Sequence, residues 1–207
     1  MKLSKEGRIR TMQKRRAASS AQKSTSKQTE GSHRNNDYES LTYGIAKSSL
    51  GHVLVASGDK GVVAVLIGES PTVVMDDLRT RFPKAHLVRD DQMHAIEISQ
   101  LINYIESAKE DVNFDLDLRG TEFQRKVWRA VRKIKIGETT TYTDLARSIG
   151  APKAIRAVAN ACSINPFAFA VPCHRVLHKE RALSFSPNRG NDRQRPMVDR
   201  EARVTKR

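Results

Sequence analysis

Residues 141–163 read Thr141-Tyr-Thr-Asp-Leu-Ala-Arg-Ser-Ile-Gly-Ala-Pro-Lys-Ala-Ile-Arg-Ala-Val-Ala-Asn-Ala-Cys-Ser163, which is the layout of two helices joined by a short turn. The first predicted helix runs from Thr141 to Ser148, and Gly150 breaks it. Pro152 suits the first turn of the second helix, which extends to about Ser163. This layout is that of a helix-turn-helix. Two helices that only pack against a core would show the same pattern, so DNA binding stays open here.

The second predicted helix is slim and carries one prominent cation. Four small residues line it: Ala154, Ala157, Ala159 and Ala161. Small side chains let a helix backbone approach another surface closely, and that surface is either a neighbouring helix or a DNA groove. Arg156 projects from this helix, and its planar cation suits stacking and hydrogen bonding within opened DNA.

A longer helix is predicted before this pair. Thr121 can cap it, Gly137 ends it, and it carries an apolar stripe of Phe123, Val127, Ala130, Val131 and Ile134. Basic residues gather in the same region, because residues 119–163 hold ten Lys or Arg against three acids. Arg147 and Lys153 lie near the turn, where phosphate contacts would need them.

The part of the chain before residue 119 predicts a small α/β unit. Two β-branched runs, 52–56 and 62–67, flank a turn-rich linker and form a hairpin signal. Helical spacing covers residues 73–82 and 93–107, and alternation over residues 113–118 predicts a short strand. The fold class is therefore α+β: a small α/β domain with a short antiparallel sheet over residues 39–118, then a helical, winged helix-turn-helix-like domain over residues 119–207.

Residues 1–38 predict a disordered basic tail. Residues 1–36 carry ten Lys or Arg against two Glu, which supplies +8 of the net charge of +14. Such a segment cannot offset its chain entropy by burying apolar surface. It is either a loose phosphate-binding arm or a solvated tail without a specific role.

Composition favours an intracellular protein without a metal. No apolar run reaches the roughly 18 residues of a membrane span, and no apolar stretch follows the basic N-terminus as in a secretory signal. The two cysteines suit a reducing compartment. No Cys-x-x-Cys occurs and the histidines are scattered, so no metal site is expected. We expect a cytoplasmic location, nucleoid-associated in a bacterium or nuclear in a eukaryote.

The stretch Ile164-Asn-Pro-Phe-Ala-Phe-Ala-Val-Pro-Cys-His-Arg-Val176 contains the candidate nucleophile. An apolar run, residues 167–171, predicts a buried strand-like segment, and Pro172 then forces a turn. Nearby cationic or polar hydrogens lower a thiol pKa from about 8.5, and only the thiolate attacks. Most intracellular cysteines are buried and inert. Cys162, inside a helix, fits that description, whereas Cys173, between a proline and a His-Arg pair, does not.

Several blocks around Cys173 together resemble one protein family. The segment 171–176 resembles the active-site motif of the O6-alkylguanine-DNA alkyltransferases. Further blocks resemble that family in the same order and spacing: Gly120–Trp128, Gly137–Ala146, Pro152–Ala161 and the hinge pair Asn165-Pro166. The resemblance covers roughly residues 41–183. It implies a ribonuclease-like N-terminal domain and a C-terminal DNA-binding alkyltransferase domain.

The resemblance implies a catalytic role for four residues. Cys173 would attack the alkyl carbon on the guanine oxygen, and His174 would relay a proton through water to a carboxylate. Glu201 stands one residue beyond the family's spacing, as after a one-residue insertion; the alternative is a surface charge. Asn165 would order the thiol's surroundings. The thioether product is stable, so the protein would act once, and no cofactor is implied.

The resemblance also implies a monomer that binds double-stranded DNA containing O6-alkylguanine and flips the damaged base outward. Tyr142 would help to rotate the nucleotide, and Arg156 would fill the vacated stack. Ala157 lies on the helix that approaches the groove, with Lys153 near its start. The backbone carbonyl of Val176 would recognise the exocyclic amine of the guanine.

The sequence departs from the family pattern after Ser184. The family continues with a Gly-Tyr-Arg-Trp-Gly type of loop, whereas residues 185–190 here read Phe-Ser-Pro-Asn-Arg-Gly. Pro187 has no N–H to donate, and Pro196 predicts a kinked or shortened last helix. An alternative function is therefore a DNA- or lesion-binding helix-turn-helix protein with impaired transfer. A cysteine hydrolase is a third class, disfavoured because the same blocks tie this cysteine to a DNA-reading helix.

Overall fold

The computed structural model describes residues 39–178 and 194–205. The tail of residues 1–38 and the atypical segment 185–190 lie outside these ranges, so the expectations for both remain predictions. Across the two described ranges, no helix has the combination of length and apolar character that crossing a bilayer requires.

The N-terminal half is built on a four-stranded sheet in the order β3-β2-β1-β4. The strands are β1 (Ser40–Ser48), β2 (Gly51–Gly58), β3 (Gly61–Gly68) and β4 (His86–Arg89). The first three pair antiparallel, and β4 pairs parallel to β1. The predicted hairpin is confirmed as β2 and β3. Its turn requires Gly61, which has φ +118° and where a Cβ would lie 2.8 Å from the carbonyl oxygen of Asp115.

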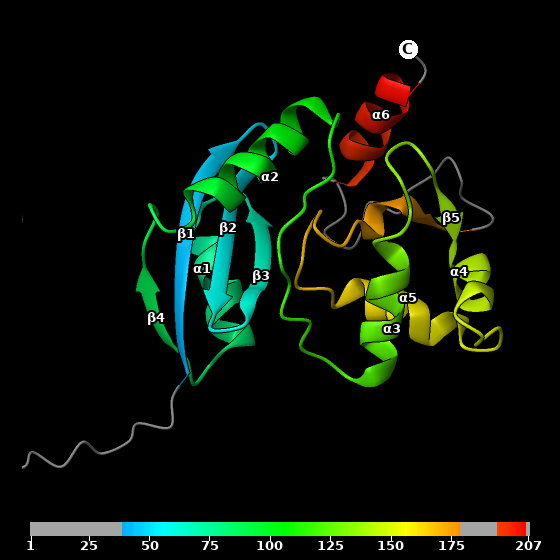
Figure 1. The fold of residues 1–207 in the computed structure, drawn as a ribbon, viewed down its shortest axis with the longest axis horizontal. Helices are drawn as coiled ribbons and strands as arrows, with labels where there is room; N and C mark the ends of the chain where they lie inside the picture. Colours follow the sequence, from blue (N-terminus) through cyan, green and yellow to red (C-terminus); the bar gives the residue numbers. More distant parts are fainter. Residues whose placement is uncertain (1–38, 179–193, 206–207) are drawn as a thin grey trace, which may run out of the picture. The chain divides into compact units, whose positions relative to one another are not determined.

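Two helices cover opposite faces of this sheet (Figure 1): α1 (Pro71–Arg81) and α2 (Ala95–Ser107). Successive strand residues point to opposite faces. Val53 of β2 therefore packs in the core that α2 covers, whereas Leu54 packs in the core that α1 covers. Both helices confirm the predictions from helical spacing. The apolar stripe of α2 is buried, and it includes Tyr104, whose hydroxyl contacts His174.

The strand predicted over residues 113–118 is wrong. Leu116 forms only an isolated parallel bridge with Val62. The amide of Val62 donates to Asp115 O at 3.0 Å, and the amide of Asp117 donates to Val62 O at 2.8 Å. The segment touches β3 at one residue and then leaves it, so the alternating apolar side chains pack on the core without a continuous strand.

The strand-like segment predicted over residues 167–171 is also a single bridge. Phe167 pairs with Val65 of β3, and the chain then turns at once. Phe169 adopts φ +64°, which no strand residue has. The burial of the segment was predicted correctly, because Phe167 and Val171 are fully buried. Its turns place Pro172 and Cys173 against the core.

The C-terminal half is helical. Its elements are α3 (Glu122–Val131), α4 (Tyr142–Ser148), α5 (Ile155–Ser163), η2 (Cys173–Arg175) and α6 (Gln194–Thr205), with β5 (Thr140–Thr141) paired parallel to β6 (Val176–Leu177). Thr121 caps α3 in a reciprocal capping box with Gln124, as its sequence indicates. Trp128 of α3 donates its indole N–H to Ala161 O of α5 at 2.8 Å, which joins the two helices in the core.

Three predicted helix boundaries need correction. α3 ends at Val131, well before Gly137, and the amides of Lys133 and Ile134 then bond three residues back in tight turns. Pro152 lies in the turn before α5, which begins only at Ile155. Pro196 does not end α6, which continues to Thr205. It stands in the first helical turn, where its missing N–H would have no intrahelical partner.

Candidate active site

Cys173 is the first residue of the short 3-10 helix η2, directly after Pro172. Its amide donates to Val171 O at 2.7 Å, so the turn that follows the buried segment fixes its backbone. The residue is 8% exposed. The thiol is therefore held in place by local structure and is almost completely shielded from solvent.

Asn165 organises the surroundings of this thiol. Its amide nitrogen Nδ2 lies 3.3 Å from Cys173 Sγ and donates to Val171 O at 3.0 Å. Its Oδ1 accepts from the amide of Phe167 at 3.0 Å. One side chain thus connects the end of α5, the buried turn and the candidate nucleophile.

A second thiol adjoins the first. A hydrogen bond to Cys162 and burial raise the pKa of Cys173 well above its usual value, and the Asn165 amide opposes this rise. The expectation of a lowered thiol pKa is therefore wrong, and Cys173 is a thiol rather than a thiolate at neutral pH. A nucleophilic reaction at this sulfur needs a base that removes its proton.

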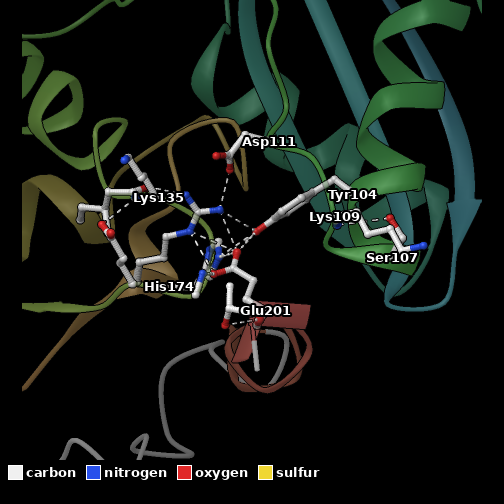
Figure 2. A network of polar contacts seen from close by, with 12 residues as sticks. Tyr104, Ser107, Lys109, Asp111, Lys135, His174 and Glu201 are labelled. Atoms are coloured by element: carbon white, nitrogen blue, oxygen red, sulfur yellow. Dashed lines mark hydrogen bonds and ion pairs between the residues drawn. The ribbon is translucent and has the colours of Figure 1, made fainter. Parts of the chain in front are cut away.

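His174 follows Cys173 and contacts a buried carboxylate. His174 Nε2 lies 2.9 Å from Glu201 Oε1 of α6 and 2.9 Å from Tyr104 Oη of α2 (Figure 2). Burial lowers the pKa of His174 below its usual value, although Glu201 opposes that shift. The imidazole is therefore neutral at physiological pH and is able to accept a proton. Glu201 is 1% exposed, so the alternative of a surface charge is wrong.

Arg175 keeps the Glu201 carboxylate ionised. Burial alone would raise the pKa of Glu201, but hydrogen bonds from His174 and Arg175 outweigh it and lower this pKa to about 2. Arg175 also donates to Asp111 at 2.6 Å and to Ile134 O at 2.5 Å. A buried charge needs such partners. Arg175, Glu201 and Asp111 thus form an ionic cluster that contacts His174 through Glu201.

The residues assigned to DNA divide into two groups. Tyr142 of α4 is half-buried, and burial together with Cys162 and Cys173 raises its pKa. Tyr142 therefore lies near both thiols, and its ring centroid is 4.8 Å from that of His178. Val176 is buried where β6 pairs with Thr140 of β5.

The other group lies at the start of the slim helix. Lys153 stands in the turn before α5, and Arg156 and Ala157 belong to its first turn. All three are exposed, whereas Cys162 near the other end of α5 is buried. Helix α5 thus has an exposed basic start and an end that contacts the nucleophile.

The structure brings together Cys173, Asn165, His174 and Glu201, with Tyr142 nearby. Tyr104 and Asp111 are site residues that sequence reasoning missed, since Tyr104 reads as one more apolar residue of the α2 stripe. Within residues 39–178 and 194–205, no group of three or more His, Cys, Asp or Glu side chains has an arrangement that could hold a metal ion.

Comparison with known proteins agrees with this geometry. Residues 122–203 match the family model described as 6-O-methylguanine DNA methyltransferase, DNA binding domain. The chain is 39% identical over 144 residues to the bifunctional transcriptional activator/DNA repair enzyme Ada of Escherichia coli K12, a match that covers 70% of this chain and 41% of Ada. The chain thus spans about two-fifths of the length of that relative.

Shorter relatives are matched over most of their length. The inducible methylated-DNA–protein-cysteine methyltransferase of Bacillus subtilis 168 is 38% identical over 134 residues, which cover 63% of this chain and 73% of that protein. The structure of Mycobacterium tuberculosis OGT in complex with DNA superposes with a TM-score of 0.65 at 32% identity, over 79% of this chain and 94% of that one. The chain therefore belongs to the methylated-DNA–protein-cysteine methyltransferase family.

Proposed function

We propose that this protein repairs DNA by transferring an alkyl group from O6 of a guanine to Sγ of Cys173. One observation carries the proposal: a buried thiol, hydrogen-bonded by Asn165, is followed directly by a neutral histidine that contacts the ionised Glu201. This arrangement supplies a nucleophile, a base and a group that orients the base.

The proposed chemistry is an in-line displacement at the alkyl carbon. His174 accepts the proton of Cys173 through a water molecule, and Glu201 stabilises the imidazolium that results. Sγ then forms a bond to the alkyl carbon as the bond from that carbon to guanine O6 breaks. The electron pair of the broken bond stays on the guanine, which takes up the proton and returns to its ordinary form.

The product is a thioether, and no described group of this site reverses its formation. The protein therefore acts once per molecule and is consumed by the reaction. Burial of Cys173 suits this role, because the nucleophile meets an alkyl carbon only when an alkylated guanine occupies the site, and water competes poorly there.

The proposed substrate is double-stranded DNA with the damaged guanine turned out of the stack. Arg156, exposed on α5, fills the space that the base leaves, and Lys153 pairs with a phosphate. The small side chain of Ala157 permits close approach of the helix. Tyr142, beside both thiols, guides the base toward Cys173. The protein is proposed to act as a monomer.

Mass spectrometry of the intact protein tests the function. After incubation with a duplex that contains one O6-methylguanine, the protein should gain the mass of one CH2 group, and peptide mapping should place it on Cys173. Cys173→Ser should gain no mass yet still bind the duplex. Cys162→Ser is the matched control, since it removes the neighbouring thiol and keeps the nucleophile.

Two results would contradict the proposal. A folded, DNA-bound wild-type protein that gains no mass would instead be a lesion binder without transfer. A gain of mass that persists in Cys173→Ser would mean that another residue is the acceptor.

A further inference from the structure

Tyr104 belongs to α2, the helix that covers one face of the sheet, yet its hydroxyl contacts both His174, the proposed general base, and the carboxylate of Glu201. Its Oη lies 2.9 Å from His174 Nε2 and also donates to Glu201 Oε1 (Figure 2). His174 and Glu201 contact each other as well, so the three groups form a closed triangle. Tyr104 is 2% exposed, and its ring packs against Phe169 with centroids 5.9 Å apart.

Counting the protons in this triangle fixes their positions. The ionised Glu201 carboxylate only accepts hydrogen bonds, so the phenol gives it its single proton. Burial and the Glu201 charge raise the pKa of Tyr104, which keeps that proton on the phenol. The phenol oxygen then has only a lone pair for His174. A contact of Nε2 with two acceptors requires that Nε2 carries hydrogen, and this leaves Nδ1 as the basic nitrogen of the neutral ring.

We propose that Tyr104 is a positioning residue for alkyl transfer, whose hydroxyl holds His174 in the tautomer with hydrogen on Nε2 and leaves Nδ1 to take the proton of Cys173. This inference rests on the proposed function of Cys173 and His174. It assigns a part in the reaction to a residue of the N-terminal half of the chain, 70 positions before His174 and 97 before Glu201.

Tyr104 also shares the charge of Glu201. The other charged groups around His174 are Arg175 on its own turn, Asp111 in the segment after α2 and Glu201 on α6. Without the phenol hydroxyl, Glu201 still accepts from Arg175 and from the amide of Gly137, so the carboxylate remains paired. The negative charge of Glu201, no longer partly neutralised by the phenol hydrogen bond, then acts more strongly on Nε2 of His174. This favours the imidazolium form and raises the pKa of His174.

Tyr104→Phe tests this inference in the full-length protein. The measurement is the single-turnover rate of transfer at saturating O6-methylguanine duplex, as a function of pH. We expect a rate about fivefold lower at neutral pH, the equivalent of one ordinary hydrogen bond. The acidic limb of the profile should move to higher pH by about one unit. Affinity for the duplex should not change.

Tyr43→Phe is the matched control, because Tyr43 packs in the separate core under α1. It should behave as the wild type. A Tyr104→Phe variant with an unshifted acidic limb would overturn the inference, even if its rate fell uniformly, since a uniform fall reflects looser packing only. If Tyr104→Phe does not fold, 3-fluorotyrosine at position 104 replaces it. This stronger donor should move the limb to lower pH, and an unmoved limb would overturn the inference.

Nitrogen-15 NMR of the His174 imidazole separates this inference from the proposed function, because it needs no alkyl transfer. The wild type should show hydrogen on Nε2 at neutral pH, and Tyr104→Phe should show a raised imidazole pKa. Hydrogen on Nδ1 in the wild type would overturn the role of Tyr104 whether or not Cys173 accepts an alkyl group. Absence of transfer with the expected NMR result would overturn only the proposed function.

Discussion

Arg175 binds the carboxylate of Glu201 through two nitrogens: Nε lies 3.1 Å from both carboxylate oxygens, and Nη2 lies 2.9 Å from Oε1. Both side chains are almost completely buried. Arg175 follows directly on the candidate nucleophile and base, and Glu201 lies on α6. The ion pair therefore joins the last helix to the turn that carries the chemistry. Breaking it should affect stability as well as transfer.

Glu201→Gln should lower the free energy of unfolding at pH 7 by about 3 kcal/mol, because removal of one partner leaves the buried Arg175 charge poorly compensated. The folded-state pKa of Glu201 is about 2, against 4.5 for an unperturbed glutamate. A lowered pKa gives stability above pH 4.5 that disappears as the pH falls toward 2. Denaturant unfolding from pH 7 to 2 should show this loss in the wild type and a flatter profile in Glu201→Gln.

Asp199→Asn is the control for this experiment, because Asp199 is an exposed acid on the same helix. Its unfolding profile should match that of the wild type within about 0.5 kcal/mol, as expected for an exposed position. Equal losses in both variants would show that the stability follows net charge and not the Arg175–Glu201 pair.

Asn165→Ala should slow the reaction of Cys173 with a small electrophile such as iodoacetamide. The Asn165 amide is the group that lowers the pKa of this thiol against burial and Cys162, so its removal leaves less thiolate at a given pH. Loss of one hydrogen bond of ordinary strength corresponds to about a fivefold lower rate. Asn113→Ala, at an exposed loop position, should leave the rate unchanged. An unchanged rate in Asn165→Ala would show that the Asn165 amide does not lower the pKa of Cys173.

Local patterns predicted those elements whose signals are local. The hairpin of β2 and β3, the Thr121 cap and the break at Gly150 each depend on a few adjacent residues. β1 and β4 carry no such signal. Gly44 weakens the strand pattern of β1 at the point where α2 packs closely, since a Cβ there would lie 2.8 Å from Ile98. β4 is short and mostly exposed. Pairing with neighbouring strands defines both elements, so their own residues are weak predictors.

The site divides in the same way. The motif around Cys173 and the spacing to Glu201 could be read along the chain. Tyr104 could not be, because its hydroxyl matters only once α2 lies against η2 and α6. A tyrosine in an apolar helical stripe is ordinary core material, and its buried hydroxyl finds a partner wherever the fold offers one. Only the three-dimensional contacts show that the partners of this hydroxyl are His174 and Glu201.

Cys162→Ala should make Cys173 more reactive at lower pH. The hydrogen bond to Cys162 is the largest cause of the raised pKa of Cys173, so removing that thiol should lower this pKa. The rate of iodoacetamide alkylation against pH should then shift toward lower pH. Cys162→Ser keeps a hydrogen-bonding group at this position, and its profile should fall between the other two. A shift to higher pH in Cys162→Ala would mean that Cys162 assists thiolate formation.

Arg156→Ala separates opening of the duplex from chemistry at the sulfur. Arg156 is exposed in the first turn of α5, at the other end of that helix from Cys162, so its loss should leave Cys173 and its base unchanged. With saturating O6-methylguanine duplex, the transfer rate should fall by about tenfold or more, because filling the vacated stack offsets an unstacking cost of a few kcal/mol. With the free alkylguanine base, which needs no flipping, the rate should stay within about twofold.

Arg129→Ala removes the same charge from an exposed position of α3 and controls for general attraction to phosphate. Equal losses on duplex and free base would place Arg156 in the chemistry, and equal losses for both variants on duplex would reduce its role to charge.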